Sequence, residues 1–489
     1  MKFSDLLAVA QVKCLGVRGQ ADVIDVQSDS RRCKAGSCFV AVRGPNENGH
    51  RYIGHAVAAG ARAIVCEDDS AVPPTVACAV LADTRRHLGR LAQVIVGCPA
   101  DKLISVGVTG TNGKSTVAHL VRTILASAGH NSAILGTISY ETGARSVPAG
   151  NTTPGAVELA EMTAEMVAAG NTHLVMEASS HALDQRRTDG IDFSVGIFTN
   201  LAGDHMDYHV NAENYLAAKR RLFEHLRPGA AAVLNLEDPA SEKMAAATAA
   251  KVIWYGLSPA ADVRGKIERI DACGTRFTLG HGPEEVSAGS PLIGRHNVLN
   301  CLAAAGACVS LGVGIDDIAR ALATVDRIRG RLERVASDAP YDVFVDYAHT
   351  DDALKNVLGA LGPLKRGRIL LVFGCGGDRD RTKRPRMARV AEELADRIIV
   401  TSDNPRSEAP QAIIDEILVG FSDEGRRRTD VRVSRREAIE LAIDSARPGD
   451  TILIAGKGHE TYQDIGGRKT HFDDVEEAAE AIRRREARP

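Results

Sequence analysis

The chain has 489 residues, 44% of them hydrophobic, with 60 Lys and Arg against 63 Asp and Glu. This length exceeds one hydrophobic core, so we expect several globular domains. The formal charge of -3 excludes a broadly positive surface for nucleic acid or lipid. An anionic ligand would therefore have to be bound by a local cluster of basic residues. No stretch approaches the roughly 20 apolar residues of a membrane span. The 10 cysteines form no CxxC pair, which favours a reducing cytoplasm.

The first predicted domain is a small α/β unit over residues 1–98. Residues 37–42 and 62–66 are typical of strands, and residues 50–60 between them are typical of a helix. A turn-rich segment around Pro99 then precedes an apolar strand at 104–108. We therefore place a domain boundary near residue 99.

A glycine-rich loop follows the strand at 104–108 and opens an amphipathic helix. Backbone N–H groups and the helix N-terminus form a phosphate site there, which the charge of Lys114 and the hydroxyl of Ser115 complete. Val108 stands where the Walker A pattern has a glycine. Strand context nevertheless favours nucleotide binding over an ordinary glycine turn, and the predicted loop consists of Gly110, Thr111, Asn112, Gly113, Lys114, Ser115 and Thr116.

Acidic and histidine side chains follow two other strands of this central segment. An apolar strand at 174–177 ends in Glu177, where P-loop proteins place a magnesium ligand. The run Asp-His-Met-Asp-Tyr-His at 204–209 follows a strand predicted at 195–201. By itself this run is a polar loop or a zinc site. Beside a P-loop it becomes a candidate second metal or substrate site.

The last third of the chain alternates helical periods with strands at 343–345, 369–373, 398–400 and 452–455. This alternation predicts a parallel sheet covered by helices on both faces. Ligands of such sheets bind at the carboxyl ends of the strands, and polar residues follow all four strands. The expected fold is α/β with three domains, the second a P-loop domain with a parallel sheet and the third Rossmann-like, over 1–98, 99–328 and 329–489.

Together these motifs resemble the Mur ligase family, and the resemblance covers essentially the whole chain. It is carried by the P-loop, by the run at 204–209, by Gly-Arg-Leu-Glu at 330–333 and by Asp-Tyr-Ala-His at 346–349. The resemblance implies an ATP-dependent ligase of peptidoglycan precursor synthesis, monomeric and cytoplasmic, with ATP and Mg²⁺ as cofactors. It also implies that ATP bridges the second and third domains, held by the P-loop, Asn297, Arg331 and Asp346.

The substrate and catalytic residues follow from the same resemblance. The first domain resembles a uridine-binding domain, and the implied contacts of UDP-N-acetylmuramoyl-L-alanyl-D-glutamate are Ser28, Ser30, Asn151, Thr152, Thr153, Ser179, Gln185 and Arg187. The implied catalytic residues are Lys114, Lys219, His205 and Arg331, and the implied metal ligands are Ser115, Glu177, His205 and a carbamate on Lys219. Carbon dioxide adds only to a neutral amine, so the site must lower the pKa of Lys219 by burial or nearby charge.

The acceptor is implied to be meso-diaminopimelate, because similar enzymes that add it carry an arginine after Asn-Pro, as Arg406 does here. A guanidinium fork suits the second carboxylate of diaminopimelate, which lysine lacks. The weaker interpretation is a turn with a helix cap. The implied pocket consists of Arg379, Asp403, Asn404, Pro405, Arg406, Gly456 and Glu460.

The expected reaction forms an acyl phosphate on the D-glutamate side chain, which a diaminopimelate amine then attacks with loss of phosphate. His205, His349 and the phosphate itself all stay open as the proton acceptor. Three alternatives stay open for the function. They are a lysine-adding Mur ligase, a ligase like folylpolyglutamate synthetase, which lacks a uridine-type first domain, and a non-ligase P-loop ATPase.

Overall fold

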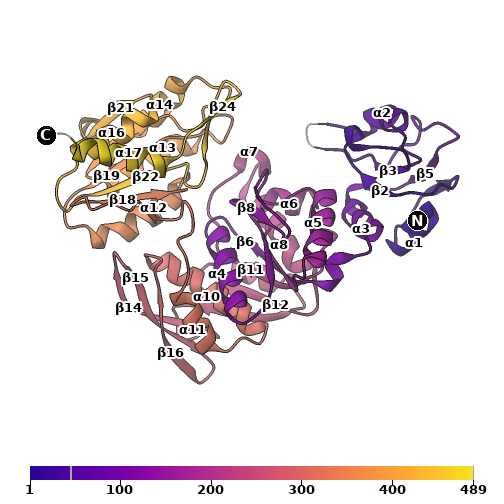
Figure 1. The fold of residues 1–489 in the computed structure, drawn as a ribbon, viewed down its shortest axis with the longest axis horizontal. Coiled ribbons are helices and arrows are strands. Elements are labelled where there is room, and N and C mark those ends of the chain that lie inside the picture. The colour runs from indigo at the N-terminus through magenta and orange to yellow at the C-terminus, as the bar shows by residue number, and fades with distance from the viewer. Residues whose placement is uncertain (45–46, 488–489) are drawn as a thin grey trace.

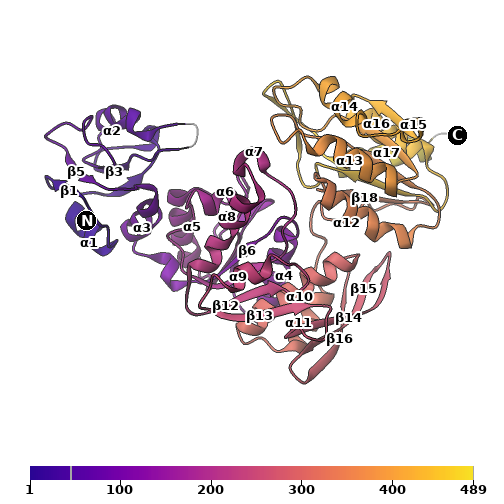
Figure 2. The same cartoon turned by 180° about the vertical axis from the view of Figure 1, so that it is seen from behind.

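The computed structural model describes residues 1–44 and 47–487 and contains three successive α/β domains. The first and third domains lie at opposite ends of the molecule, and the central domain joins them (Figure 1). The view from behind shows the same arrangement (Figure 2). The predicted three-domain α/β fold is confirmed. Within the described residues, no helix is long and apolar enough to cross a membrane.

The first domain is a five-stranded sheet with helices on both faces. Its elements are α1 (Phe3–Val9), β1 (Gly16–Arg18), β2 (Asp25–Gln27), β3 (Ser37–Val40), α2 (Ile53–Ala58), β4 (Ala63–Cys66), β5 (Ala77–Val80) and α3 (Arg85–Ile95). The strand order is β1-β5-β4-β3-β2, and only β1 is antiparallel to its neighbour. The helix predicted at 50–60 is wrong at its start, because the Asn48 side chain caps a separate 3-10 turn, Gly49–Tyr52.

The first domain packs firmly on the central one. Three residues of α5 (Ala156–Ala168) join the apolar cluster beneath α3. Helix α3 and the segment after α6 approach so closely that a Cβ added to Gly89 would lie 2.8 Å from the Gly190 nitrogen. Gln93 Nε2 also donates to Thr163 Oγ1 across this contact, at 3.0 Å. Apolar packing and a buried hydrogen bond therefore fix the first domain against the central domain.

The central domain is built on an 11-stranded sheet. Besides α5, its elements are β6 (Ile104–Thr109), α4 (Lys114–Ser127), β7 (Ser132–Leu135), β8 (Ser139–Glu141), β9 (Ser146–Pro148), β10 (His173–Glu177), α6 (Ser180–Asp184), β11 (Phe193–Phe198), α7 (Met206–His209), α8 (Ala212–Glu224), β12 (Leu226–Asn235), α9 (Ser241–Ala245), β13 (Lys251–Gly256), β14 (Val263–Asp271), β15 (Gly274–His281), β16 (Glu284–Ser290), α10 (Arg295–Ser310) and α11 (Ile315–Ala323). The strand order is β16-β15-β14-β13-β12-β11-β6-β10-β7-β8-β9.

Strands β7 to β14 of this order are parallel, whereas antiparallel hairpins extend both ends of the sheet. Helices α4, α10 and α11 cover one face, and α5, α8 and α9 cover the other. The strand predicted at 195–201 is wrong at its end, since β11 stops at Phe198. The chain leaves the sheet there because Thr199 Oγ1 donates to the P-loop carbonyl of Asn112 at 2.6 Å.

The third domain has a six-stranded sheet. Its elements are β17 (Glu333–Arg334), β18 (Asp342–Asp346), α12 (Asp351–Leu361), β19 (Ile369–Phe373), α13 (Lys383–Leu394), β20 (Arg397–Thr401), α14 (Pro410–Leu418), α15 (Asp423–Arg427), β21 (Thr429–Arg432), α16 (Arg435–Ser445), β22 (Thr451–Ala455), a hairpin of β23 (Tyr462–Ile465) and β24 (Arg468–His471), and α17 (Asp474–Glu486). The strand order is β17-β18-β22-β19-β20-β21, with α12, α13 and α14 on one face and α16 and α17 on the other.

The parallel pairing predicted for the third domain is confirmed, since its four predicted strands β18, β22, β19 and β20 pair in parallel. The sheet also has one antiparallel edge, which was not predicted. The short strand β17 pairs antiparallel with β18, because the chain entering from the central domain runs opposite to β18. Gly330 precedes β17 with φ +66°, and a Cβ there would lie 2.2 Å from the His459 nitrogen. We keep the proposed boundaries near residues 99 and 329, which fall between α3 and β6 and between α11 and β17.

A buried ion pair supports the carboxyl ends of the third sheet. Arg435 and Asp474 are both fully buried, and the guanidinium donates twice to the carboxylate, each time at 2.7 Å. Arg435 Nη2 also donates to the carbonyl of Ala455, the last residue of β22, at 3.0 Å. The pair therefore ties α16 and α17 to the end of a strand that leads into a polar loop.

Replacing one partner of this pair should destabilise the third domain. We expect Arg435→Met to lower its free energy of unfolding by about 3–5 kcal/mol, because Asp474 would keep an uncompensated buried charge. Removing both charges in Arg435→Met with Asp474→Leu should restore most of that loss. Scanning calorimetry of the full chain measures both. A double variant no more stable than the single one would contradict the electrostatic explanation.

Candidate active site

The P-loop closes around its own lysine. Lys114 Nζ donates to the carbonyls of Gly110 and Thr111 at 3.0 and 2.9 Å. Burial lowers the pKa of this ammonium, against the opposing charges of Glu177 and Asp204. Gly110 has φ +148°, and a Cβ on it would lie 1.8 Å from Thr199 Oγ1, so no other residue fits this turn. The loop thus presents N–H groups and a cation at the start of α4, as phosphate binding requires.

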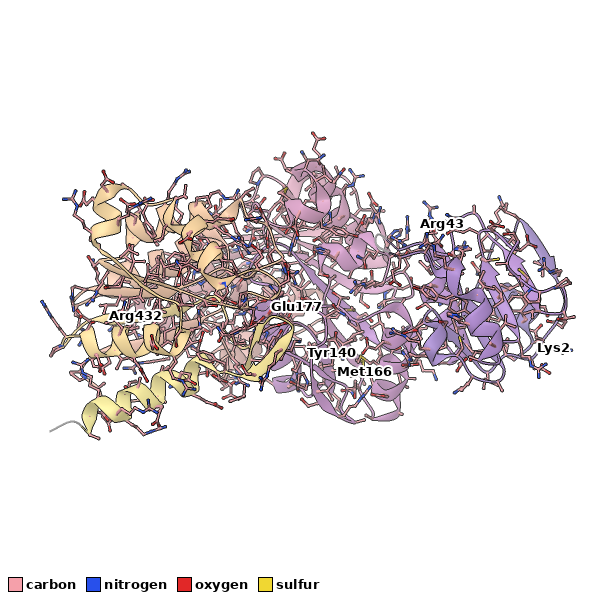
Figure 3. The ribbon with its side chains drawn as sticks, turned by 90° about the horizontal axis from the view of Figure 1, so that it is seen from above. Lys2, Arg43, Tyr140, Met166, Glu177 and Arg432 are labelled. Carbon is pink, nitrogen blue, oxygen red and sulfur yellow. The ribbon has the colours of Figure 1, made fainter. Side chains whose placement is uncertain are left out.

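Glu177 ends β10 where the central domain borders the third (Figure 3). Its carboxylate is buried and accepts hydrogen bonds from the Thr137 nitrogen at 2.7 Å and from Thr137 Oγ1 at 3.0 Å. It lines a cavity of about 240 Å³ together with Lys114 and Ser115. Hydroxyl and carboxylate oxygens beside a phosphate loop are the ligand types that Mg²⁺ prefers.

The third domain reaches the P-loop through two hydrogen bonds. Arg331 Nη2 donates to Ser115 Oγ at 2.8 Å, and Asn112 Nδ2 donates to Asp352 Oδ2 at 2.6 Å. Asp346 lines the same cavity, and burial raises the pKa of its carboxyl group. The cavity therefore lies between two domains, so a ligand filling it touches both.

A polar helix face completes this interdomain cavity. Asn297, near the start of α10, lines it and donates through Nδ2 to the Ile293 carbonyl at 2.9 Å. Asn300, one turn later, donates to Asn297 Oδ1 at 2.9 Å and also lines the cavity. The two amides therefore hold each other in a fixed orientation in the wall of the cavity.

A cluster of titratable groups lies beside the P-loop. Asp204 is buried, and despite that burial the neighbouring charges of His205, His349 and Lys383 lower its pKa to about 2. Burial lowers the pKa of His205 to about 3. Lys219 on α8 is 1% exposed, and its ammonium lies 4.2 Å from the centroid of the Tyr215 ring. Burial and the charge of Lys114 hold the pKa of Lys219 well below its ordinary value.

A second cavity, of about 630 Å³, opens on the carboxyl ends of the third sheet. Arg406 has φ +52°, and its Nη1 donates to the Gly377 carbonyl at 2.7 Å. Glu460 Oε2 accepts from Asn404 Nδ2 at 2.7 Å and from Lys457 Nζ at 3.3 Å. The residues predicted for this pocket that line it are Arg379, Asp403, Asn404, Arg406, Gly456 and Glu460.

The two cavities share one wall. Six residues line both of them, namely Thr137, Thr152, Asp204, His205, Tyr347 and His349. The P-loop cavity and the Arg406 cavity are therefore adjacent at these six residues.

A third cavity, also of about 630 Å³, lies between the first and central domains. Ser28 and Ser30 line it from the first domain, and Gln185 and Arg187 line it from the segment after α6. Arg187 donates to Gln185 Oε1 through Nε at 3.0 Å and Nη2 at 2.6 Å. Residues more than 150 positions apart in the sequence thus line one cavity, as the prediction of a common substrate site required.

Several predicted site residues lie behind the cavities. Thr153 is fully buried and donates to the Glu177 carbonyl at 2.7 Å, while Ser179 Oγ caps α6 by accepting from the Ala182 nitrogen. Pro405 is buried behind Asn404, and Lys219 lies behind the P-loop. Asn151 and Thr152 line the second cavity, and Thr116 belongs to the cavity around the P-loop.

Three residues in or beside the cavities were not predicted from the sequence. Thr137 follows β7 and anchors Glu177, Asp352 contacts the P-loop, and Lys383 is a buried cation of the second cavity. Lys383 ends the polar run after β19, Gly-Gly-Asp-Arg-Asp-Arg-Thr-Lys. From this run the sequence predicted only Arg379 as a site residue. In the described part of the chain, no three His, Cys, Asp or Glu side chains are grouped to hold a metal ion.

The fold and the joined cavities define an ATP-dependent ligase, with a nucleotide loop on one domain and an acceptor pocket on another. Family models agree in order along the chain: the "Mur ligase family, catalytic domain" matches 24–95, the "Mur ligase middle domain" 108–308, and the "Mur ligase, glutamate ligase domain" 330–458. The chain belongs to the Mur ligase family.

Similar proteins extend over its whole length. UDP-N-acetylmuramoyl-L-alanyl-D-glutamate--2,6-diaminopimelate ligases of Geobacter metallireducens and Geobacter sulfurreducens are 44% and 43% identical to it, each over 99% of this chain and 98% and 99% of the relatives. A solved structure of a ligase of the same name aligns with a TM-score of 0.67 at 33% identity, covering 95% of this chain and 96% of that one.

Proposed function

We propose that the protein joins meso-diaminopimelate to the D-glutamate side-chain carboxylate of UDP-N-acetylmuramoyl-L-alanyl-D-glutamate at the expense of ATP, a step of peptidoglycan precursor synthesis. The observation that carries the proposal is the wall shared by the P-loop cavity and the Arg406 cavity. A ligase needs its activated carboxylate and its acceptor amine to meet, and this wall is where they would meet. The names of the full-length relatives support the same substrates.

The nucleotide cavity suits ATP with Mg²⁺. The P-loop from Gly110 to Thr116 would hold the phosphates, while Asn297 and Asp346 would hold the nucleoside side. Oxygen donors at Ser115 and Glu177, with His205 and a carbamate on Lys219, form the proposed metal ligands. Bound Mg²⁺ would neutralise phosphate charge. Lys114 and Arg331, facing each other across the domain boundary, would offset the charge that develops on the transferred phosphoryl group.

The proposed substrate path runs along all three domains. Ser28, Ser30, Gln185 and Arg187 would bind the UDP-linked end in the third cavity. Asn151 and Thr152 would guide the peptide toward the shared wall, with Thr153 and Ser179 supporting that path from behind. We propose that the protein acts as a monomer, with residues of all three domains lining the path. ATP and a UDP-linked substrate are cytoplasmic metabolites, so we place the reaction in the cytoplasm.

The amide-forming step requires a neutral amine. Burial holds the pKa of His205 at about 3 and that of His349 at about 4, so both imidazoles are neutral at pH 7 but are weak bases. The departing phosphate is a stronger base than either. We therefore propose phosphate as the final acceptor of the amine proton, with the two histidines lining the path.

The acceptor pocket favours a second amino-acid centre. Arg406 and Arg379 offer guanidinium groups to a carboxylate, and Glu460 with Asp403 offers acidic groups to an ammonium. We expect Arg406→Ala to lower kcat/KM for meso-diaminopimelate about 100-fold, because a charge-assisted hydrogen bond in a desolvated pocket is lost. Any activity with L-lysine should stay unchanged, because lysine lacks the second carboxylate. Steady-state phosphate release with each acceptor measures both effects.

Arg432 provides the matched control for this variant. It is an exposed arginine on β21 of the same domain, and Arg432→Ala should leave both acceptors unaffected. Loss of activity with lysine as well as diaminopimelate in Arg406→Ala would show that Arg406 maintains the domain rather than selecting the acceptor.

Activity of the wild-type protein tests the proposed reaction against the alternatives drawn from the sequence. Phosphate release from ATP should require both UDP-N-acetylmuramoyl-L-alanyl-D-glutamate and meso-diaminopimelate, with product verified by mass. Equal use of L-lysine would support a lysine-adding ligase. Turnover only with folate and glutamate would support a ligase like folylpolyglutamate synthetase. Phosphate release without any acceptor would support a non-ligase P-loop ATPase.

A further inference from the structure

Lys383 is a largely buried lysine at the start of a helix. It is the first residue of α13 and is 6% exposed, and within the described residues its ammonium has no hydrogen bond or ion pair. Its Nζ is not fully buried, and the residue lines the second cavity. A cation at a helix N-terminus meets the positive end of the helix dipole, which is unfavourable. An anion bound in that cavity would offset this cost.

The surroundings of Lys383 indicate where that anion lies. Lys383 lines the second cavity together with Arg379 and Arg406, but it does not belong to the P-loop cavity. Asp204 and His349 line the same cavity as Lys383, and both belong to the wall shared with the P-loop cavity. The lysine therefore stands on the acceptor side of the wall.

Other cations already serve the two ends of the site. Lys114 and Arg331 face the phosphates from the nucleotide side, and Arg406 with Arg379 faces the far end of the acceptor. Between them, the amide-forming step places new negative charge on the carbonyl oxygen. Buried cations directed at such developing charge are strong transition-state stabilisers.

We propose that Lys383 is a catalytic residue of the second half-reaction, which stabilises the oxyanion that forms when the acceptor amine attacks the acyl phosphate. This inference rests on the proposed function. The amine nitrogen bonds to the carbonyl carbon, and the C=O electron pair moves to the oxygen beside Lys383. When that pair returns, the bond from carbon to the phosphate oxygen breaks. Phosphate departs with the bonding electrons and takes the proton that the amine releases.

The test separates the two half-reactions in the full-length protein. Lys383→Met removes the charge and keeps the length of the side chain, whereas Lys383→Arg keeps the charge. Acyl phosphate is measured in a single turnover with ATP and UDP-N-acetylmuramoyl-L-alanyl-D-glutamate, without acceptor, by borohydride reduction to the alcohol. Amide formation is measured as kcat and KM with meso-diaminopimelate. Lys365→Met is the matched control, since Lys365 is an exposed lysine of the same domain, paired with Asp396 at 2.9 Å.

The expected result is a split between the two assays. Lys383→Met should form acyl phosphate at a yield within about twofold of the wild type, while kcat for amide formation falls about 100-fold with little change in KM. Lys383→Arg should retain more activity than Lys383→Met, and Lys365→Met should match the wild type. Unchanged melting temperatures establish that the variants fold.

Three results would overturn this assignment. An equal loss of acyl phosphate would place Lys383 in phosphoryl transfer. A raised KM for diaminopimelate with unchanged kcat would make it a binding residue for the acceptor carboxylate. Unchanged kinetics would give it no role in the reaction. If the wild type itself forms neither acyl phosphate nor amide, the proposed function fails, and that outcome is distinct from all three.

Discussion

Replacing Lys219 by alanine should lower kcat for ligation by about 10³–10⁴-fold, since the proposed carbamate would supply a metal-bound carboxylate worth several kcal/mol of transition-state stabilisation. Lys219 is buried beside the Tyr215 ring, with Lys114 as a neighbouring cation. Both burial and that like charge lower the pKa of Lys219, which favours the neutral amine. A neutral buried amine is the form that adds carbon dioxide, and the resulting carbamate suits Mg²⁺.

A carbamate on Lys219 would carry a negative charge, whereas a protonated lysine or an arginine carries a positive charge. Lys219→Arg keeps a cation but cannot form the carbamate, so it should be as inactive as Lys219→Ala. Native mass spectrometry should find one added CO₂ on the wild type and none on either variant. Arg220→Ala is the matched control on the same helix, because Arg220 is exposed and pairs with Glu224 at 2.7 Å. Activity retained in Lys219→Arg would exclude the carbamate.

Replacing Arg331 by alanine should lower kcat by about 10³-fold, and it should block acyl phosphate formation itself. The Arg331 guanidinium crosses the domain boundary to donate to Ser115 Oγ at 2.8 Å, and it lies 4.9 Å from the Tyr347 ring. Its Nε is buried without a hydrogen-bond partner, and the residue lines the cavity beside the P-loop. An arginine that contacts a transferring phosphoryl group typically raises kcat by about 10³–10⁵-fold.

The Arg331 variant has a clear contrast with Lys383→Met. Borohydride trapping should yield almost no acyl phosphate from Arg331→Ala, although ATP binding measured by calorimetry should weaken much less than kcat. Arg327→Ala is the control in the same interdomain segment, since Arg327 is exposed and donates to the Arg334 carbonyl at 3.1 Å. Normal acyl phosphate from Arg331→Ala would move this arginine out of phosphoryl transfer.

The sequence alone predicted the parts of the molecule whose physics is local. Apolar runs such as 369–373 and 104–108 are strands in the structure, and the glycine-rich loop between a strand and a helix follows from backbone sterics. The three-domain α/β fold also followed from the order of strands and helices. The side-chain types of the candidate site were readable because polar residues follow buried strands.

Only the tertiary structure decided how these parts meet. That Arg331 bonds to Ser115, and Asn112 to Asp352, depends on the angle between two domains, which no periodicity encodes. The burial of Lys219 and Lys383 was equally hidden, since a lysine on an amphipathic helix is ordinarily solvated. The sequence determines local conformation through short-range sterics and through the regular spacing of hydrophobic residues. The pKa values and neighbours of buried charges depend instead on long-range packing, which only the folded chain defines.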